Sequence, residues 1–119
     1  MKATVEKIVT AYMAVKNFND KVPSTLAFRL GRFEDKTISI VKSFEKANAK
    51  LFKEYGEQIE GQPEGSLKIK KEVEDKYNEE IRVILDQEEE VDYSINLSLF
   101  EGVDVSKNFF VAMGDFIKE

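Results

Sequence analysis

The chain contains no cysteine and no histidine. The lack of cysteine excludes disulfides, thiol catalysis and thiolate metal sites, and the lack of histidine removes the commonest general base and the commonest metal ligand. These two absences restrict the chemistry more than any motif that is present. We therefore expect no catalytic residue, no cofactor and no metal site, and we expect that the protein is not an enzyme.

Long hydrophobic runs are missing as well. Stretches without a charge, such as "IVTAYMAV" and "YSINLSLF", are far shorter than the roughly 20 residues that a membrane-spanning helix requires. The N-terminal "MKATVEKIV" lacks the continuous apolar block and the small-residue cleavage site of a secretory signal. These features predict no membrane partner and an intracellular, cytoplasmic location.

Glycine-rich phosphate loops are also absent. The six glycines are scattered and none is followed by Lys-Ser or Lys-Thr, so nucleotide hydrolysis of the Walker type is not expected. The acidic run "DQEEE" does not match the alternating acidic spacing of a calcium loop. It is more typical of a solvated helix end.

What the chain has is a length of 119 residues, with 42% apolar and 34% charged side chains. This length and composition are typical of one folded globular domain, here residues 1–119. The charge is uneven: residues 1–53 carry eleven Lys/Arg and five Asp/Glu, whereas residues 54–104 carry five Lys/Arg and sixteen Asp/Glu. Such asymmetry indicates either two halves of one domain that attract each other or a nucleic-acid-binding half. We favour the first interpretation, and direct binding of nucleic acid is not expected.

Helical periodicity dominates the first half of the chain. Apolar residues from Thr4 to Phe18 recur at helical spacing and predict a first short helix, with some strand character at its start. After "NDKVPS", Ser24 or Thr25 is expected to cap a second helix that runs to Tyr55, with Gly56 in the left-handed conformation after its end. The seam of this long helix consists of Leu26, Leu30, Phe33, Thr37, Ile40, Phe44, Ala47, Leu51 and Tyr55. Because Phe44 lies in the middle of the seam, we expect it to be a core residue.

The second half begins with "GEQIEGQPEG", residues 56–65, whose three glycines and one proline predict an exposed loop between helices. Ser66 is expected to cap a third helix that ends near Gln87 and returns antiparallel to the long one. The segment "VDYSINLSL", residues 91–99, alternates apolar and polar side chains without fault and predicts a half-buried strand. Its partner is expected to be the N-terminal residues 1–5, a short piece near residues 67–69, or another chain.

The end of the chain predicts a short fourth helix, capped by Asp104 or Ser106 and burying the apolar positions between Phe109 and Ile117. The predicted fold is therefore mainly α with a minor β element: a long antiparallel helical hairpin flanked by short N- and C-terminal helices. Arg29, Arg32 and Lys36, interleaved with Phe28 and Phe33, also resemble a basic patch with stacking aromatics. The simpler interpretation is that the phenylalanines are core and the cations are solvated.

The run "LAFRLGRFEDKTISIVKSFEKANAKLFKEYGE", the spacer "GQPEG", the acidic helix and "INLSLFEGVDVSKNFFVAMGDFI" together resemble a set of small uncharacterised proteins encoded by tailed bacteriophages and prophages. The resemblance lies in the order and pattern of the elements over nearly the whole chain. It implies a phage origin, a helical fold, and a virion-associated or host-interaction role in the bacterial cell. It assigns no catalytic role to any position of this chain.

Two functions fit these patterns. The first is a non-enzymatic protein–protein interaction protein, either a minor virion or assembly component or a host-interaction factor, that binds a virion protein, a host protein or a second copy of itself. The second is an acidic inhibitor of a host defence or nucleic-acid enzyme that mimics phosphates. The candidate interaction residues are Glu72, Glu79, Glu80, Glu88, Glu89, Glu90, Asp92, Ile95 and Leu97.

Overall fold

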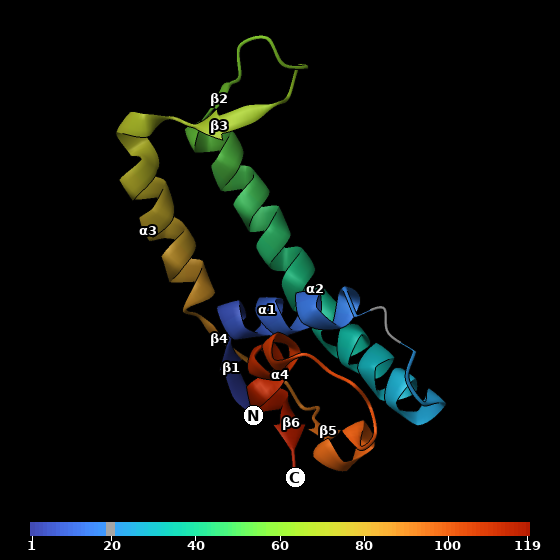
Figure 1. Cartoon of the computed structure of the whole chain (residues 1–119). Coiled ribbons are helices and arrows are strands. Elements are labelled where there is room, and N and C mark those ends of the chain that lie inside the picture. The colour runs from blue at the N-terminus through green and yellow to red at the C-terminus, as the bar shows by residue number, and fades with distance from the viewer. Residues whose placement is uncertain (19–20) are drawn as a thin grey trace.

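The computed structural model describes residues 1–18 and 21–119 (Figure 1). Its four α-helices are α1 (Val5–Lys16), α2 (Ser24–Tyr55), α3 (Glu74–Leu85) and α4 (Lys107–Met113). Its strands are β1 (Lys2–Thr4), β2 (Gly56–Gln58), β3 (Leu67–Ile69), β4 (Glu88–Glu90), β5 (Ile95–Asn96) and β6 (Ile117–Lys118). Three 3-10 helices, η1 (Lys71–Val73), η2 (Leu97–Phe100) and η3 (Gly114–Phe116), complete the described elements. The predicted mainly helical fold with a minor β component is confirmed.

The molecule is elongated along α2. Its extents are 50 × 31 × 23 Å and its radius of gyration is 17.4 Å, against about 13.5 Å for a compact domain of this length. In Figure 1, α1 crosses α2 near its middle, α4 lies beside α1, and β6 follows α4 on the side away from α1. The second half of α2 extends beyond this cluster and is accompanied by α3, which returns antiparallel to it. The structure thus has two parts. In the core end, α1, α4 and the first half of α2 pack together, and the projecting arm consists of the second half of α2, the β2–β3 hairpin and α3.

Helix α2 has the predicted bounds, but its two ends differ from the prediction. The cap residue is Pro23, and among the described residues no side chain caps the helix, so neither Ser24 nor Thr25 has the predicted role. Gly56 has φ −88° and begins β2, so it is not in the left-handed conformation. A glycine is required there for a different reason: an added Cβ atom would lie 2.3 Å from the carbonyl oxygen of Phe52.

The core lies at the crossing of α1 and α2. Leu26, Phe33 and Val41 of α2 are almost completely buried, together with Ile8 of α1. Phe33 meets Phe116 of η3 edge-on, with ring centroids 5.1 Å apart. The buried Thr37 hydroxyl donates a hydrogen bond to the carbonyl oxygen of Phe33 at 2.8 Å, so this polar group is satisfied within the helix.

From Ile40 onward the seam of α2 changes character, because Ile40, Phe44, Ala47 and Leu51 are only half-buried, and the seam is fully buried again only at Tyr55. The prediction that Phe44 is a core residue is therefore wrong. Phe44 lies on the arm, where α3 and the start of α1 cover α2 incompletely. The long stripe is covered by α1 and the C-terminal segments at one end and by α3 at the other.

The predicted strand at residues 91–99 is wrong in its bounds. The N-terminal strand β1 pairs antiparallel with β4, which precedes the predicted strand, in the register Lys2 with Glu90 and Thr4 with Glu88. A backbone hydrogen bond from Val91 N to Met1 O (2.9 Å) continues this pairing by one residue. Within residues 91–99 only β5 is a strand, and it pairs in parallel with β6. The N-terminal segment was thus predicted correctly as a partner, but for the wrong residues.

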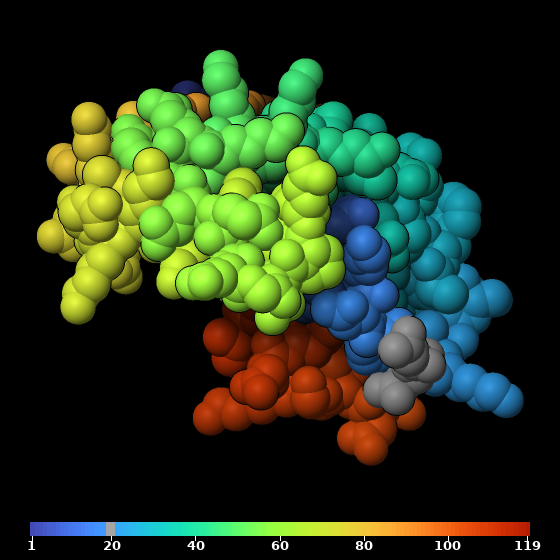
Figure 2. All heavy atoms as spheres, turned by 90° about the horizontal axis from the view of Figure 1, so that it is seen from above, coloured from blue at the N-terminus to red at the C-terminus, as the bar shows by residue number. Residues whose placement is uncertain are grey.

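The connection between α2 and α3 also differs from the prediction. The pairing of β2 with β3 makes a hairpin that uses residues 56–58 and 67–69, so the connecting loop comprises residues 59–66. In the view from above, this loop covers the end of the arm (Figure 2). Because β3 and η1 occupy residues 67–73, the third helix begins at Glu74 and is not capped by Ser66. The fourth helix begins as predicted, since the Ser106 side chain accepts a hydrogen bond from Phe109 N, but it ends at Met113, and Phe116 and Ile117 lie in η3 and β6.

The expected charge attraction between α2 and α3 does not take the form of ion pairs. Among residues 1–18 and 21–119, no ion pair within 4.0 Å joins these two helices. Arg82 of α3 instead pairs with Glu6 of α1, and Lys7 of α1 pairs with Asp115 of η3 at 2.8 Å. The lysines of α2 and most of the acidic residues of α3 therefore face solvent.

Candidate functional site

A pocket opens where α2, α3 and the start of α1 diverge; we call it the arm pocket. Its volume is about 200 Å³. It is lined by Val5, Ser39, Ile40, Ser43, Phe44, Ile84, Gln87 and Glu89. The lining combines an apolar floor of aliphatic and aromatic side chains with a rim of two hydroxyls, an amide and a carboxylate.

The sequence places these side chains together by helical spacing. Ile40 and Phe44 are four residues apart and lie on the seam of α2, while Ser39 and Ser43 precede each by one position and lie on the adjacent face. Ile84 reaches the pocket from the last turn of α3. The pocket therefore has a rigid helical wall on each side, a geometry suited to binding a protruding side chain.

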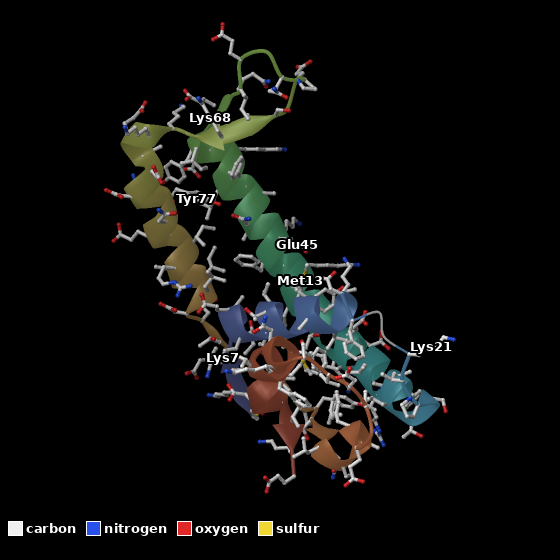
Figure 3. The ribbon with its side chains drawn as sticks, viewed as in Figure 1. Lys7, Met13, Lys21, Glu45, Lys68 and Tyr77 are labelled. Atoms are coloured by element: carbon white, nitrogen blue, oxygen red, sulfur yellow. The ribbon has the colours of Figure 1, made fainter. Side chains whose placement is uncertain are left out.

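Aromatic side chains join α3 to the C-terminal part of α2, between the arm pocket and the β2–β3 hairpin. Tyr77 projects from α3 toward α2 (Figure 3), where its hydroxyl donates a hydrogen bond to Asn48 Oδ1 at 2.6 Å. Its ring lies edge-on to those of Phe52 and Tyr55, with centroid distances of 6.1 and 6.4 Å. Burial raises the pKa of Tyr77. This cluster fixes the separation of α2 and α3 above the pocket.

Glu80 is directed into the same interface and is half-buried. Its carboxylate raises the pKa of Tyr55 to about 12, first as a hydrogen-bond acceptor for the hydroxyl, with burial and negative charge contributing further. Among the described residues, Glu80 Oε2 is buried and has no hydrogen-bond partner of its own. Glu80 was expected to lie on an acidic interaction surface, but it faces Tyr55, so we remove it from that set.

We expect one of the four tyrosines to ionise near pH 12, two units above its ordinary pKa of 10.0, and Tyr55→Phe to remove that late transition. Because the folded-state pKa is raised, Tyr55 contributes stability that is fully present below pH 10 and is lost as the pH rises toward 12. Ultraviolet absorbance of the phenolate, followed during an alkaline titration of both proteins, measures this. Tyr93→Phe is the matched control, because among the described residues the Tyr93 hydroxyl donates only to the carbonyl oxygen of Arg29 and meets no carboxylate. A late transition that survives in Tyr55→Phe would contradict the assignment.

The other predicted acidic residues are exposed but do not converge. Glu72 lies in η1 at the outer end of the arm and Glu79 lies on α3, whereas Glu88, Glu89 and Glu90 form β4 at the opposite end of α3. Asp92 follows β4 and is also exposed. Because α3 is about 18 Å long, these carboxylates are spread over the length of the arm. Among the described residues, no group of three or more acidic side chains could hold a metal ion.

Two of the β4 glutamates have local roles. Glu89 belongs to the rim of the arm pocket. Glu90 accepts a 2.6 Å hydrogen bond from the amino group of Met1, and this contact lowers the pKa of Glu90. The acidic strand is thus partly neutralised where it pairs with β1.

The two predicted apolar interaction residues separate in the structure. Ile95 is 0% exposed and belongs to the core, so a partner cannot reach it. Leu97 is 41% exposed and borders a shallow hollow at the C-terminal end, together with Phe100 and Phe110. The expectation of an interaction residue is therefore wrong for Ile95, whereas Leu97 stays available.

Sequence reasoning missed the arm pocket, although part of its signal was present. Ile40 and Phe44 were recognised as seam residues, but nothing in their spacing indicates that their cover is incomplete. Gln87 and Glu89 come to the rim because β4 pairs with β1, which is a long-range contact. No local pattern encodes that pairing.

No protein-family model matches the chain, and no curated protein and no solved structure matches it either. Among the helices of the described residues, none combines the length and the apolar character needed to cross a membrane.

Proposed function

We propose that this protein acts by binding another protein, and that the arm pocket receives an apolar side chain of the partner. The size of the pocket carries the proposal. Small-molecule sites usually occupy about 300–1,000 Å³, so a pocket of about 200 Å³ is too small for most metabolites. It is suited to one aliphatic or aromatic side chain, the kind of anchor that dominates protein interfaces.

The exposed surface supports the same proposal. A compact monomer of 13.7 kDa exposes about 6,600 Å², whereas this chain exposes 8220 Å². The excess of roughly 1,600 Å² is larger than the area of about 800 Å² that one partner buries in a standard protein–protein interface. Within α3, which is described throughout, no residue is fully buried, so the arm is the natural place for a partner to add cover.

The resemblance to small phage and prophage proteins suggests the setting. On this proposal the chain is a phage-encoded, non-enzymatic factor that works in the bacterial cytoplasm or as part of the virion. Its partner is a virion or host protein, or a second copy of the chain. Size-exclusion chromatography with light scattering on the chain alone detects the last of these.

We expect Ser43→Trp to weaken partner binding at least about tenfold, because the indole would occupy the arm pocket. Ser43 is exposed, so the substitution leaves the core intact. The partner is first captured by cross-linking in infected cells and identified by mass spectrometry, and its affinity is then measured with purified proteins. Ala49→Trp is the matched control, since Ala49 is also exposed on α2 but lies outside the pocket. Equal affinities for the two variants would contradict the role of the pocket, and a chain that binds no protein but turns over a small molecule would contradict the function.

Acidic mimicry remains the second candidate, because α3 presents a face of carboxylates. Asp75, Glu79 and Asp86 lie opposite the apolar stripe of α3 and extend over about 16 Å, but Arg82 interrupts this face. Salt dependence separates the two functions. Binding through the arm pocket should persist at high salt, whereas binding through exposed carboxylates should be lost as salt rises.

A further inference from the structure

A second hollow lies at the start of α2, at the opposite end of this helix from the β2–β3 hairpin. It has a volume of about 460 Å³ and is mainly polar. Its lining consists of Thr25, Arg29, Ser94, Asn96, Ser98, Leu99 and Lys118. Among the described residues, the lining comprises two cations, three hydroxyls and an amide, and no carboxylate. In a chain with a net charge of −5, such a concentration of donors is unexpected.

The β5–β6 pair positions one side of the hollow. In its parallel register Asn96 lies opposite Lys118, and the neighbouring Ile95 lies opposite Ile117. Because Ile95 is buried in the core, the alternation of the strand directs Asn96 and Lys118 to the other face. The hollow is therefore built on backbone pairing as well as on long flexible side chains.

Helix α2 positions the other side. Thr25 and Arg29 are four residues apart and lie on one face of the first two turns. The Tyr93 hydroxyl donates a 3.3 Å hydrogen bond to the carbonyl oxygen of Arg29, which holds the chain before β5 against this part of α2. Three separate segments thus meet around the hollow.

The donors of the hollow are largely unused. Among residues 1–18 and 21–119, neither Arg29 nor Lys118 has an ion-pair partner within 4.0 Å. Asn96 Oδ1 accepts hydrogen bonds from the backbone N–H of Ser98 (2.9 Å) and from its hydroxyl (2.7 Å). This leaves the NH₂ group of Asn96 as a donor. The first turn of α2 carries no acidic residue that could neutralise the site.

The basic patch noted in the sequence continues the same face. Arg32 and Lys36 follow Arg29 at steps of three and four residues, so the three cations lie on one side of α2, and all are exposed. Phe33 is buried in the core, and Phe28 is 64% exposed, so the aromatics do not form a stacking array with the cations. The patch is therefore an electrostatic surface that leads to the hollow.

We propose that this hollow binds a phosphate group. A tetrahedral phosphate has several acceptor oxygens pointing in different directions, which suits donors that approach from α2, β5 and β6. Two cations can balance the two charges of a terminal phosphate, and Arg29 can contact it with two parallel N–H groups. A planar carboxylate would use fewer of these donors. The site is separate from the arm pocket and does not depend on the function proposed above.

The test is a titration of the ¹⁵N-labelled chain with inorganic phosphate, followed by NMR at constant ionic strength. We expect amide shifts at Thr25, Arg29, Asn96 and Lys118, and saturable binding. Arg29→Gln and Lys118→Gln should each weaken binding about tenfold, as expected for the loss of one charged contact. Lys50→Gln is the matched control, because it removes the same charge from an exposed position far along α2 and should leave affinity unchanged. Thermal unfolding of each variant checks that the fold is retained.

Parallel titrations identify the source of the phosphate and the specificity. Binding of adenosine monophosphate with the same variant pattern would indicate a phosphomonoester ligand, whereas acetate should cause no saturable shift. The proposal is overturned if phosphate up to about 50 mM gives no localised shifts, since a site of millimolar affinity would be saturated there. It is also overturned if Lys50→Gln weakens binding as much as Arg29→Gln. If the affinity for a single-stranded oligonucleotide is unchanged by the Arg29 and Lys118 substitutions, phosphate is recognised elsewhere on the protein.

Discussion

Phe33→Ala should lower the free energy of unfolding by about 3 to 5 kcal/mol, the usual range for emptying a buried aromatic site. Phe33 is 0% exposed and lies where α1, α2 and η3 meet. Its edge-on contact with Phe116 would also be lost. Because domains of this size are stable by about 5 to 15 kcal/mol, the substitution removes a large fraction of the total.

Equilibrium urea denaturation, followed by circular dichroism, measures this loss. Phe44→Ala is the informative comparison, since Phe44 belongs to the same seam but is half-buried on the arm. We expect it to cost only about 1 to 2 kcal/mol, because much of its surface is already in contact with water. Equal losses for the two variants would contradict the division of α2 into a core end and an arm.

The long helix could be predicted closely from the sequence, because its signal is repeated over 32 residues. The helical spacing repeats at each apolar position from Leu26 to Tyr55. A misleading residue at one position therefore does not change the prediction for the whole segment. Gly31 does not interrupt the helix, and open space surrounds it. Ser106 was also predictable, since capping requires only a side chain and a backbone N–H three residues later.

The short strands could not be predicted in the same way. A strand of three residues, such as β2 or β3, has too few positions to show a period of two. The hairpin depends instead on its loop, where Gly61 (φ 79°) and Gly65 (φ 92°) adopt conformations that disfavour other residues. The glycines were recognised as turn residues, but the pairing they permit was not.

The candidate site was less predictable than the fold, because no local sequence pattern shows that the neighbouring elements cover a helix face only in part. Ile40 and Phe44 have the same spacing as the buried Phe33, and they differ from it in how completely α1 and the C-terminal segments cover them. The hollow at the start of α2 was partly indicated by Arg29, but Lys118 joins it only through the β5–β6 register. Long-range pairing therefore determines both sites.

Ile95→Ala should cost about 2 to 5 kcal/mol of unfolding free energy, whereas Leu97→Ala should cost less than about 1 kcal/mol. The sequence pattern treats the two residues alike, because both lie on the apolar side of the alternating segment 91–99. The structure separates them: Ile95 is 0% exposed and pairs with Ile117, while η2 begins at Leu97 and turns its side chain toward solvent, leaving it 41% exposed. The chain leaves the extended conformation at this point because the Asn96 side chain accepts a hydrogen bond from Ser98 N and caps η2. Urea denaturation of both variants measures the difference. Similar large losses would mean that the strand continues through Leu97, as the alternation alone predicts, and would contradict the end of β5 at Asn96.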